Sequence, residues 1–231
     1  MSYAAVVFDF FGTLTPDTPS HVWDAHAARS ASPLGISPTV WRAALDSSFH
    51  ERLIGTLGDL PQTFRTLARR CGVEPDEMAL AAACAARTDA QRELFVLRED
   101  ALPTLRQLRA KGLRVGVLSN CTIELVDAWP SLPLASLVEM AVFSCMEGRR
   151  KPDPILYKAA AQRLGVEASS CLYISDGDGR ELAEASVCNM TAVMLRSAER
   201  VDRDVRREKN EWPGRLIESL SVVPKLLEEE L

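Results

Sequence analysis

The stretch VVFDFFGTLT, residues 6 to 15, joins the end of an apolar run to a single carboxylate, Asp9. A short apolar run of this kind is consistent with a buried strand. An ionised carboxylate at the end of such a strand costs free energy unless a partner or a ligand uses the charge. The stretch therefore predicts a buried strand that ends at Asp9, with a partner or a ligand for the Asp9 carboxylate. It also raises a question, because the residue two positions further on is Phe11 rather than a second acid.

Further short apolar runs follow along the chain, and amphipathic helical patterns separate several of them. The runs comprise residues 4–8, 113–120, 140–145, 171–175 and 191–195. Continuous apolar strands that alternate with helices predict a parallel sheet covered on both faces. The expected fold class is α/β, with a Rossmann-like parallel sheet as its core.

The segment from residue 16 to residue 98 breaks this alternation, because only helical patterns occur in it. Within it, Trp41, Leu45 and Phe49 recur at four-residue spacing, which predicts a buried helix face. We therefore expect an all-helical domain, named here the helical insert (residues 16–98). It would interrupt a Rossmann-like core formed by residues 1–15 and 99–231.

Composition restricts the binding partners and the cellular location that we expect for this protein. The formal net charge of −5 disfavours nucleic acid and anionic membranes, which attract basic surfaces. No signal-peptide pattern and no bilayer-spanning run is found, so a cytoplasmic location is expected. The six cysteines show no CxxC pair and no histidine companions, which predicts free buried thiols rather than a disulfide or zinc site. They are Cys71, Cys84, Cys121, Cys145, Cys171 and Cys188.

Polar side chains come directly after the apolar runs. In an open parallel sheet such residues meet at the carboxyl edge. Asp9 can attack an electrophile as a nucleophile, and Ser119 can donate a hydrogen bond to an anionic oxygen. Lys151 can neutralise that anion and keep Asp9 ionised. Asp176 offers the hard oxygen ligand that Mg²⁺ prefers, with Asp178 and Glu181 close by. Positioning and charge neutralisation are most of what phosphoryl transfer requires.

Four motifs in this order resemble the haloacid dehalogenase superfamily. They are DFFGTL, VLSN, RRKPDP and YISDGDGRELAEA, beginning at residues 9, 117, 149 and 173. The resemblance covers nearly the whole chain outside the helical insert. It implies a helical cap domain in the position of the insert, closing over the site and selecting the substrate.

The resemblance also implies roles for individual residues. Asp9 would be the nucleophile, Thr13 and Ser119 would hold the transferred group, and Lys151 would bridge nucleophile and substrate. Mg²⁺ would bind Asp9, Asp176 and the backbone carbonyl of Phe11. The residues expected to bind substrate are Gly12, Asn120 and Arg52. Asp178 and Glu181 would support the metal through water, although Glu181 is also explained as an acid in the first turn of a helix.

Phe11 departs from the phosphatases of this family, which usually carry a second aspartate there for acid–base catalysis. Losing such a group costs roughly 10²–10⁴-fold in rate. Three interpretations stay open: a phosphatase whose leaving groups need little protonation or whose acid comes from the insert, a metal-independent 2-haloacid dehalogenase, or a silent phosphate-binding module. A phosphonatase is disfavoured, because residues 16–98 contain no lysine. Asp176 favours the Mg²⁺-dependent phosphatase, because a haloacid would gain nothing from an extra carboxylate. The expected partner is a small-molecule substrate, and the expected assembly is a monomer or a homodimer.

Overall fold

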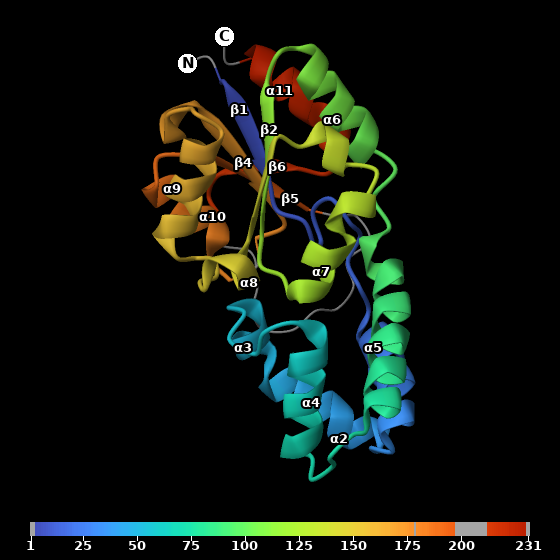
Figure 1. The fold of residues 1–231 in the computed structure, drawn as a ribbon. Coiled ribbons are helices and arrows are strands. Elements are labelled where there is room, and N and C mark those ends of the chain that lie inside the picture. The colour runs from blue at the N-terminus through green and yellow to red at the C-terminus, as the bar shows by residue number, and fades with distance from the viewer. Residues whose placement is uncertain (1–2, 178, 197–211, 230–231) are drawn as a thin grey trace.

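A computed structural model describes residues 3–177, 179–196 and 212–229 (Figure 1). Its six strands form one sheet with the order β3-β2-β1-β4-β5-β6, and every pairing is parallel. The strands are β1 Ala5–Phe8, β2 Arg114–Ser119, β3 Met140–Phe143, β4 Cys171–Ser175, β5 Thr191–Leu195 and β6 Arg215–Ile217. The predicted α/β fold with a parallel sheet is confirmed. The edge strand β6 was not anticipated, because its three residues are too short to form a recognisable apolar run.

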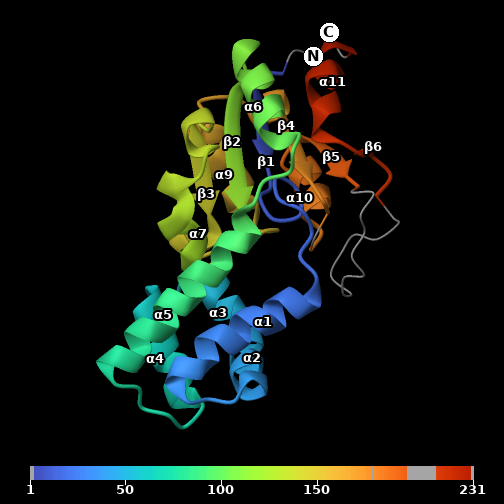
Figure 2. The same ribbon diagram turned by 90° about the vertical axis from the view of Figure 1, so that its right-hand side faces the viewer.

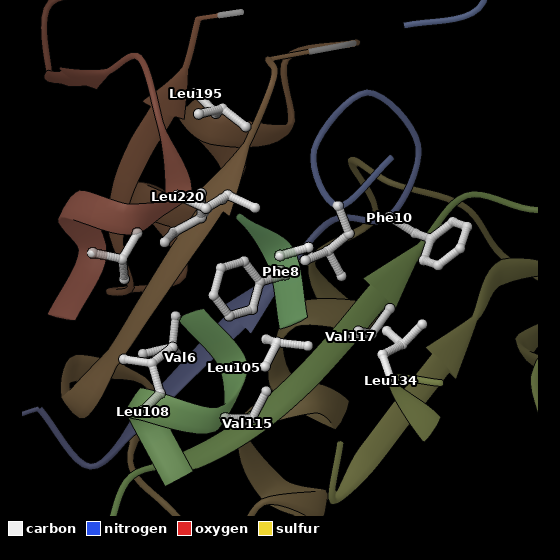
Figure 3. Close-up of a cluster of buried hydrophobic side chains, with 14 of the residues drawn as sticks. Val6, Phe8, Phe10, Leu105, Leu108, Val115, Val117, Leu134, Leu195 and Leu220 are labelled. Atoms are coloured by element: carbon white, nitrogen blue, oxygen red, sulfur yellow. The ribbon is translucent and has the colours of Figure 1, made fainter. Parts of the chain in front are cut away.

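Successive residues of β1 point to opposite faces of the sheet, and both faces are apolar. Val6 and Phe8 belong to one buried cluster, whereas Ala5 and Val7 belong to a second cluster on the other face. Figure 3 shows the first cluster, with Phe8 among side chains of neighbouring elements. Burial on both faces explains why the strand reads as a continuous apolar run rather than an alternating one.

Helices cover both faces and so complete the core. Those packed on the side of Phe8 are α6 Ala101–Ala110 and α11 Val223–Glu229, and those on the opposite side are α9 Pro154–Arg163 and α10 Glu181–Val187. Two short helices, α7 Ile123–Ala128 and α8 Ser144–Glu147, follow β2 and β3. Figure 1 shows the two pairs of covering helices on either side of the sheet.

The helices of the insert gather beyond the carboxyl ends of the strands, at the opposite end of the molecule from both termini (Figures 1 and 2). They are α1 Ser20–Ala31, α2 Pro38–Ser47, α3 Phe49–Leu53, α4 Leu60–Arg70 and α5 Glu77–Gln91. These helices share a buried cluster of their own, in which the rings of Trp41 and Phe64 meet edge to face with centroids 5.1 Å apart. The sheet edge that carries the polar residues therefore faces the helical insert.

The stripe predicted from Trp41, Leu45 and Phe49 is wrong at its last member. Trp41 and Leu45 are buried, but Phe49 is 37% exposed. The chain leaves helical geometry at Ser48, whose ψ is 1°, so α2 and α3 are separate helices. This break turns Phe49 outward, and Arg52 is buried instead.

None of the helices in the described ranges is long and apolar enough to cross a membrane.

Candidate active site

Asp9 directly follows β1 and is only 6% exposed. Its backbone N–H donates to the carbonyl of Ile174 at 2.9 Å, which continues the pairing of β1 with β4. The chain then turns tightly, since the N–H groups of Leu14 and Thr15 both donate to the carbonyl of Phe10, at 2.9 and 3.1 Å. This turn holds the Asp9 carboxylate at the centre of the carboxyl edge of the sheet.

Gly12 allows the turn to take its shape. Its φ is +77°, a left-handed conformation that favours glycine. A Cβ atom at this position would lie 2.5 Å from Oδ2 of Asp176, so the Asp176 carboxylate lies directly against the Gly12 backbone. The loops after β1 and β4 can therefore approach closely enough to bring their two aspartates together.

Lys151 lies in the loop between α8 and α9 and is 3% exposed. Its Nζ donates to Oδ1 of Asp9 at 2.5 Å and to the hydroxyl of Tyr173 at 3.1 Å, and it also forms an ion pair with Glu181. Burial alone would lower the pKa of Lys151, but the Asp9 and Glu181 carboxylates outweigh burial and raise that pKa above its ordinary value. Lys151 therefore stays charged and serves two carboxylates at once.

Asn120 holds the Lys151 loop in place. Its side-chain oxygen accepts from the backbone N–H of Lys151 at 2.7 Å, and its side-chain amide donates to the carbonyl of the same residue at 3.2 Å. Sequence reasoning expected Asn120 to bind substrate. The contact that the structure does provide fixes the backbone of the lysine.

Ser119 is the last residue of β2, and its side chain is fully buried. Its Oγ has no hydrogen-bond partner in the part of the chain that the structure describes. A buried hydroxyl without a partner costs free energy, so such groups are uncommon in native proteins. The position of Ser119 at the carboxyl edge leaves this donor available to a ligand.

Thr13 connects the two aspartates. Its hydroxyl donates to Oδ2 of Asp9 at 3.4 Å and accepts from the backbone N–H of Asp176 at 3.0 Å. Asp9, Asp176 and Glu181 each offer a carboxylate oxygen, and these oxygens lie within 4.8 Å of one another. Oxygen atoms at this spacing can share one cation.

The charge of this cluster favours a cation. Burial raises the pKa of Asp9 from 3.8 to about 7, with Lys151 opposing the rise and Glu181 adding to it. Asp9 and Glu181 share the single ammonium group of Lys151, and Asp176 brings a further carboxylate. A divalent cation bound among these oxygens would offset their repulsion and favour the ionised form of Asp9. The residues present therefore fit Mg²⁺, which binds one or two carboxylates together with water and phosphate.

Glu181 contacts the groups of the site directly, whereas the sequence suggested that it supports a metal ion through water. It is the first residue of α10, and its carboxylate contacts the Lys151 ammonium and accepts from the hydroxyls of Ser175 and Tyr173, the latter at 3.0 Å. Sequence reasoning missed both hydroxyl residues. The available signal was that Tyr173 and Ser175 lie two residues apart in an otherwise apolar strand, so they share one face. Asp178 lies outside the described residues.

Phe11 precedes the insert and is half-buried in an aromatic group. Its ring meets Phe10 edge to face with centroids 5.0 Å apart, and it lies 6.3 Å from the ring of Phe95. The side chain thus packs against the apolar core of the sheet domain. It offers no group that could exchange a proton with a leaving group.

Arg52 lies on α3 and is 8% exposed. Its guanidinium donates to the carbonyl of Leu45 at 2.7 Å and to the hydroxyl of Ser48 at 3.3 Å, and burial lowers its pKa to about 10. Together with Thr122 and Glu124 it lines a cavity of about 160 Å³ between the insert and the sheet domain. The structure thus places Arg52 at the boundary between the two, and no hydrogen bond or ion pair found in the described part of the chain joins it to Asp9.

The sheet order reverses direction between β1 and β4, and ligands of open α/β sheets bind at such a switch point. Asp9 and Asp176 lie on either side of it. A buried acid, an ammonium group and further carboxylates at this position define an α/β enzyme. A family model described as haloacid dehalogenase-like hydrolase matches residues 3–183. The chain belongs to this family and is a hydrolase, which confirms the resemblance seen in its motifs.

Similar proteins of this family include both phosphatases and dehalogenases. The glyceraldehyde 3-phosphate phosphatase of Methanopyrus kandleri is 27% identical over 88% of each chain. The (S)-2-haloacid dehalogenase 4A of Burkholderia cepacia is 30% identical over 75% of each chain. A crystal structure of the 2-haloacid dehalogenase of Pseudomonas syringae shares the fold with a TM-score of 0.74 and 23% identity, over 99% of this chain and 100% of that one.

Proposed function

We propose that this hydrolase is a Mg²⁺-dependent phosphatase acting on a small phosphorylated molecule, with Asp9 as the nucleophile. The observation that carries the proposal is the approach of the Asp9 and Asp176 carboxylates, with oxygens within 4.8 Å, next to an ammonium group at 2.5 Å. A dehalogenase needs the nucleophile and the ammonium group but has no use for the second aspartate. Relatives named as phosphatases support the choice.

The protein groups divide the work of phosphoryl transfer. Asp9 attacks phosphorus and forms an aspartyl intermediate, which water then hydrolyses. Lys151 neutralises negative charge shared by nucleophile and phosphate. Ser119 donates its free hydroxyl to a phosphate oxygen, and Thr13 keeps the Asp9 carboxylate oriented. Gly12 and Asn120 shape the edge of the phosphate pocket. Gly12 allows the tight turn after β1, and Asn120 holds the backbone of Lys151.

Asp9, Asp176 and the backbone carbonyl of Phe11 would hold the metal ion, which supplies Lewis-acid stabilisation of phosphate charge. Glu181 and Asp178 would support this site. Glu181 already anchors Lys151, Tyr173 and Ser175, so it acts mainly by keeping the ammonium group in place.

Phe11 restricts the substrates that this site can hydrolyse. A phosphatase without a positioned acid loses roughly 10²–10⁴-fold in rate for leaving groups that need protonation. Phosphate esters or anhydrides with good leaving groups are affected least. We therefore propose a substrate whose leaving group departs as a stable anion.

We also assign substrate selection to the helical insert, as a cap domain of residues 16–98 on a core of residues 1–15 and 99–231. Arg52 supports this assignment, since its buried guanidinium lines the cavity at the boundary of the two parts. It forms no ion pair with a carboxylate within 4.0 Å among the described residues. The Glu124 carboxylate, which lines the same cavity, acts on Arg52 without forming such an ion pair, and an anionic group of the substrate would supply the direct partner. A cytoplasmic location and a monomeric or homodimeric state complete the proposal.

The experiment compares phosphate release from a panel of phosphoesters, acyl phosphates among them, with and without a chelator. The expected result is Mg²⁺-dependent release that is fastest for good leaving groups and is abolished in Asp9→Asn. Asp127→Asn is the matched control, because Asp127 is an acid of the short helix α7 that has no role in the proposed site. Phosphate release that persists unchanged in Asp9→Asn would disprove the proposal.

A second candidate function is hydrolysis of 2-haloacids. Phe11 favours it, because halide leaves without a proton and an aromatic residue at this position is compatible with that chemistry. The dehalogenase of Burkholderia cepacia supports it as a relative. Halide release from 2-chloropropionate that a chelator does not affect, with no phosphate release from the panel, would establish this function in place of the first.

A further inference from the structure

Two of the six cysteines lie side by side next to the proposed site. In the pairing of β2 with β3, Ser119 lies opposite Phe143. Cys121 and Cys145 each come two residues after this pair, Cys121 in the loop that follows β2 and Cys145 in α8, which directly follows β3. The paired residues at the strand ends lie about 4.8 Å apart, so the two segments that carry the cysteines leave the sheet side by side.

Ser144 extends this contact beyond the strands. Its hydroxyl accepts from the backbone N–H of Cys121 at 2.9 Å and donates to the carbonyl of the same residue at 3.2 Å. Because Ser144 directly precedes Cys145, these hydrogen bonds hold the two cysteine backbones next to each other. Both side chains belong to the same buried cluster, and each thiol shifts the pKa of the other.

The two thiols differ in reactivity and access. The neighbouring Cys121 thiol lowers the pKa of Cys145, whereas burial raises the pKa of Cys121 and of the four remaining cysteines. Cys145 is 9% exposed and lines the cavity between the insert and the sheet domain, while Cys121 is 1% exposed. The reactive thiol is thus the one that a small oxidant can reach, with a second thiol beside it.

We propose that Cys121 and Cys145 form a reversible redox pair that closes to a disulfide when a peroxide enters the cavity. The Cys145 thiolate attacks a peroxide oxygen, the O–O bond breaks, and a sulfenic acid and hydroxide form. The Cys121 thiol then attacks the sulfenic sulfur, the S–S bond forms, and the sulfenic hydroxyl leaves as water with the Cys121 proton, while the proton that Cys145 lost on ionisation neutralises the hydroxide of the first step. Two thiols are oxidised, one hydrogen peroxide is reduced, and two waters are released.

The consequence for activity rests on the function proposed above. Cys121 directly follows Asn120, whose side chain holds the backbone of Lys151 by two hydrogen bonds. Drawing Cys121 toward Cys145 moves the segment that carries Ser119 and Asn120. The oxidised protein is therefore less active than the reduced one, and a thiol reductant restores it.

The first test needs no assay of activity. The folded protein is treated with hydrogen peroxide, unreacted thiols are alkylated under denaturing conditions, and the disulfide is located by mass spectrometry of peptides. The expected result is loss of two of the six thiols, a single Cys121–Cys145 link, and recovery of both thiols with dithiothreitol. Cys145→Ser and Cys121→Ser should each abolish the link, whereas Cys171→Ser, at another buried cysteine, should not.

Other results would overturn the pairing. A link between different cysteines, an unchanged thiol count, or peroxide consumption by Cys171 instead of Cys145 would each be incompatible with it. Phosphate release is measured as a second readout, on oxidised and reduced samples. A link that forms without any change in release contradicts the regulatory role alone. Absence of release from the reduced protein refutes the proposed function and leaves the redox pair intact.

Discussion

At the scale of single residues, the site is built by burying charge and then compensating it. Asp9 and Lys151 are both less than 7% exposed, which would be unfavourable for either alone. Two carboxylates keep the Lys151 ammonium group charged: that of Asp9, in contact at 2.5 Å, and that of Glu181. The hydroxyl of Ser119 is different, because it is buried without compensation in the described structure. An uncompensated polar group points to a role outside folding.

Ser119→Ala should therefore lower activity without lowering stability. Removing the donor is expected to reduce phosphate release roughly 10²-fold, the usual effect of losing one hydrogen bond to transition-state charge. The free energy of unfolding should stay within about 0.5 kcal/mol of wild type or rise, because this hydroxyl has no hydrogen bond to lose among the described residues. Steady-state kinetics and urea denaturation of the same preparation measure both quantities.

Ser144→Ala provides the matched control. Ser144 is also a fully buried serine, but its hydroxyl makes two hydrogen bonds to the Cys121 backbone. Its loss should destabilise the protein by about 1–3 kcal/mol, because a buried N–H and carbonyl lose their partner. Equal destabilisation by the two variants would mean that Ser119 has a structural partner after all.

At the scale of elements, short loops determine how closely functional groups at the strand ends approach one another. They also determine how closely the insert approaches the sheet domain. Gly55, in the loop after α3, shows how close the insert comes to the sheet domain. Its φ is +71°, and a Cβ atom there would lie 2.0 Å from the carbonyl oxygen of Cys145, just after β3. Gly35 has a similar φ of +65° but has nothing within 4 Å of the same position.

Gly55→Ala should consequently destabilise the protein more than Gly35→Ala. Both variants incur the cost of a left-handed residue with a side chain, about 1–2 kcal/mol. Only Gly55→Ala must also push the loop of the insert away from the backbone of Cys145. The comparison of unfolding free energies isolates the contact between insert and sheet domain. Equal unfolding free energies for the two variants would show that the loop of the insert can move away from Cys145 without loss of stability.

At the scale of the whole molecule, one buried ion pair joins the insert to the sheet domain. Arg87 of α5 contacts Glu124 of α7 at 2.9 Å, with both side chains 5% exposed. Burial by itself would raise the pKa of Glu124, but Arg87 and Arg52 outweigh burial and hold that pKa at about 2, below its ordinary value of 4.5. Of the ion pairs found in the described ranges, this is the buried one that crosses the boundary.

This pair predicts a pH dependence of stability. A carboxyl group whose pKa is lower in the folded state stabilises the protein above its unfolded pKa, here 4.5, and loses that contribution as the pH falls toward 2. The contribution is on the order of 3 kcal/mol. Glu124→Gln, which does not titrate, should be less stable than wild type near neutral pH. The difference should shrink as the pH falls from about 5 toward 2.

Urea denaturation at a series of pH values tests this prediction. Glu51→Gln is the control, because Glu51 pairs with Arg70 at the surface, where solvent screens the interaction. Its difference from wild type should change little with pH. A constant difference between wild type and Glu124→Gln would show that Glu124 is not held ionised by the two arginines.

The sequence alone was sufficient for the order of the first five strands and for the residues at their ends. Strands buried on both faces leave continuous apolar runs, and the side chains that follow them are marked by their position. For this reason Asp9, Ser119, Lys151 and Asp176 could be selected together. The break at Ser48 and the outward turn of Phe49 could not be predicted, because a local change of ψ leaves no trace in the spacing of apolar residues.

The tertiary structure decided which groups touch. Glu181 anchors Lys151 with the help of Tyr173, and Arg52 lies at the boundary of the insert rather than beside the aspartates. The approach of the Cys121 segment to Cys145 likewise depends on the hydrogen bonds of Ser144 to the Cys121 backbone. Such contacts join residues far apart in the chain. A local pattern determines which face a side chain occupies, but only the packing of one element on another determines the atom that it meets.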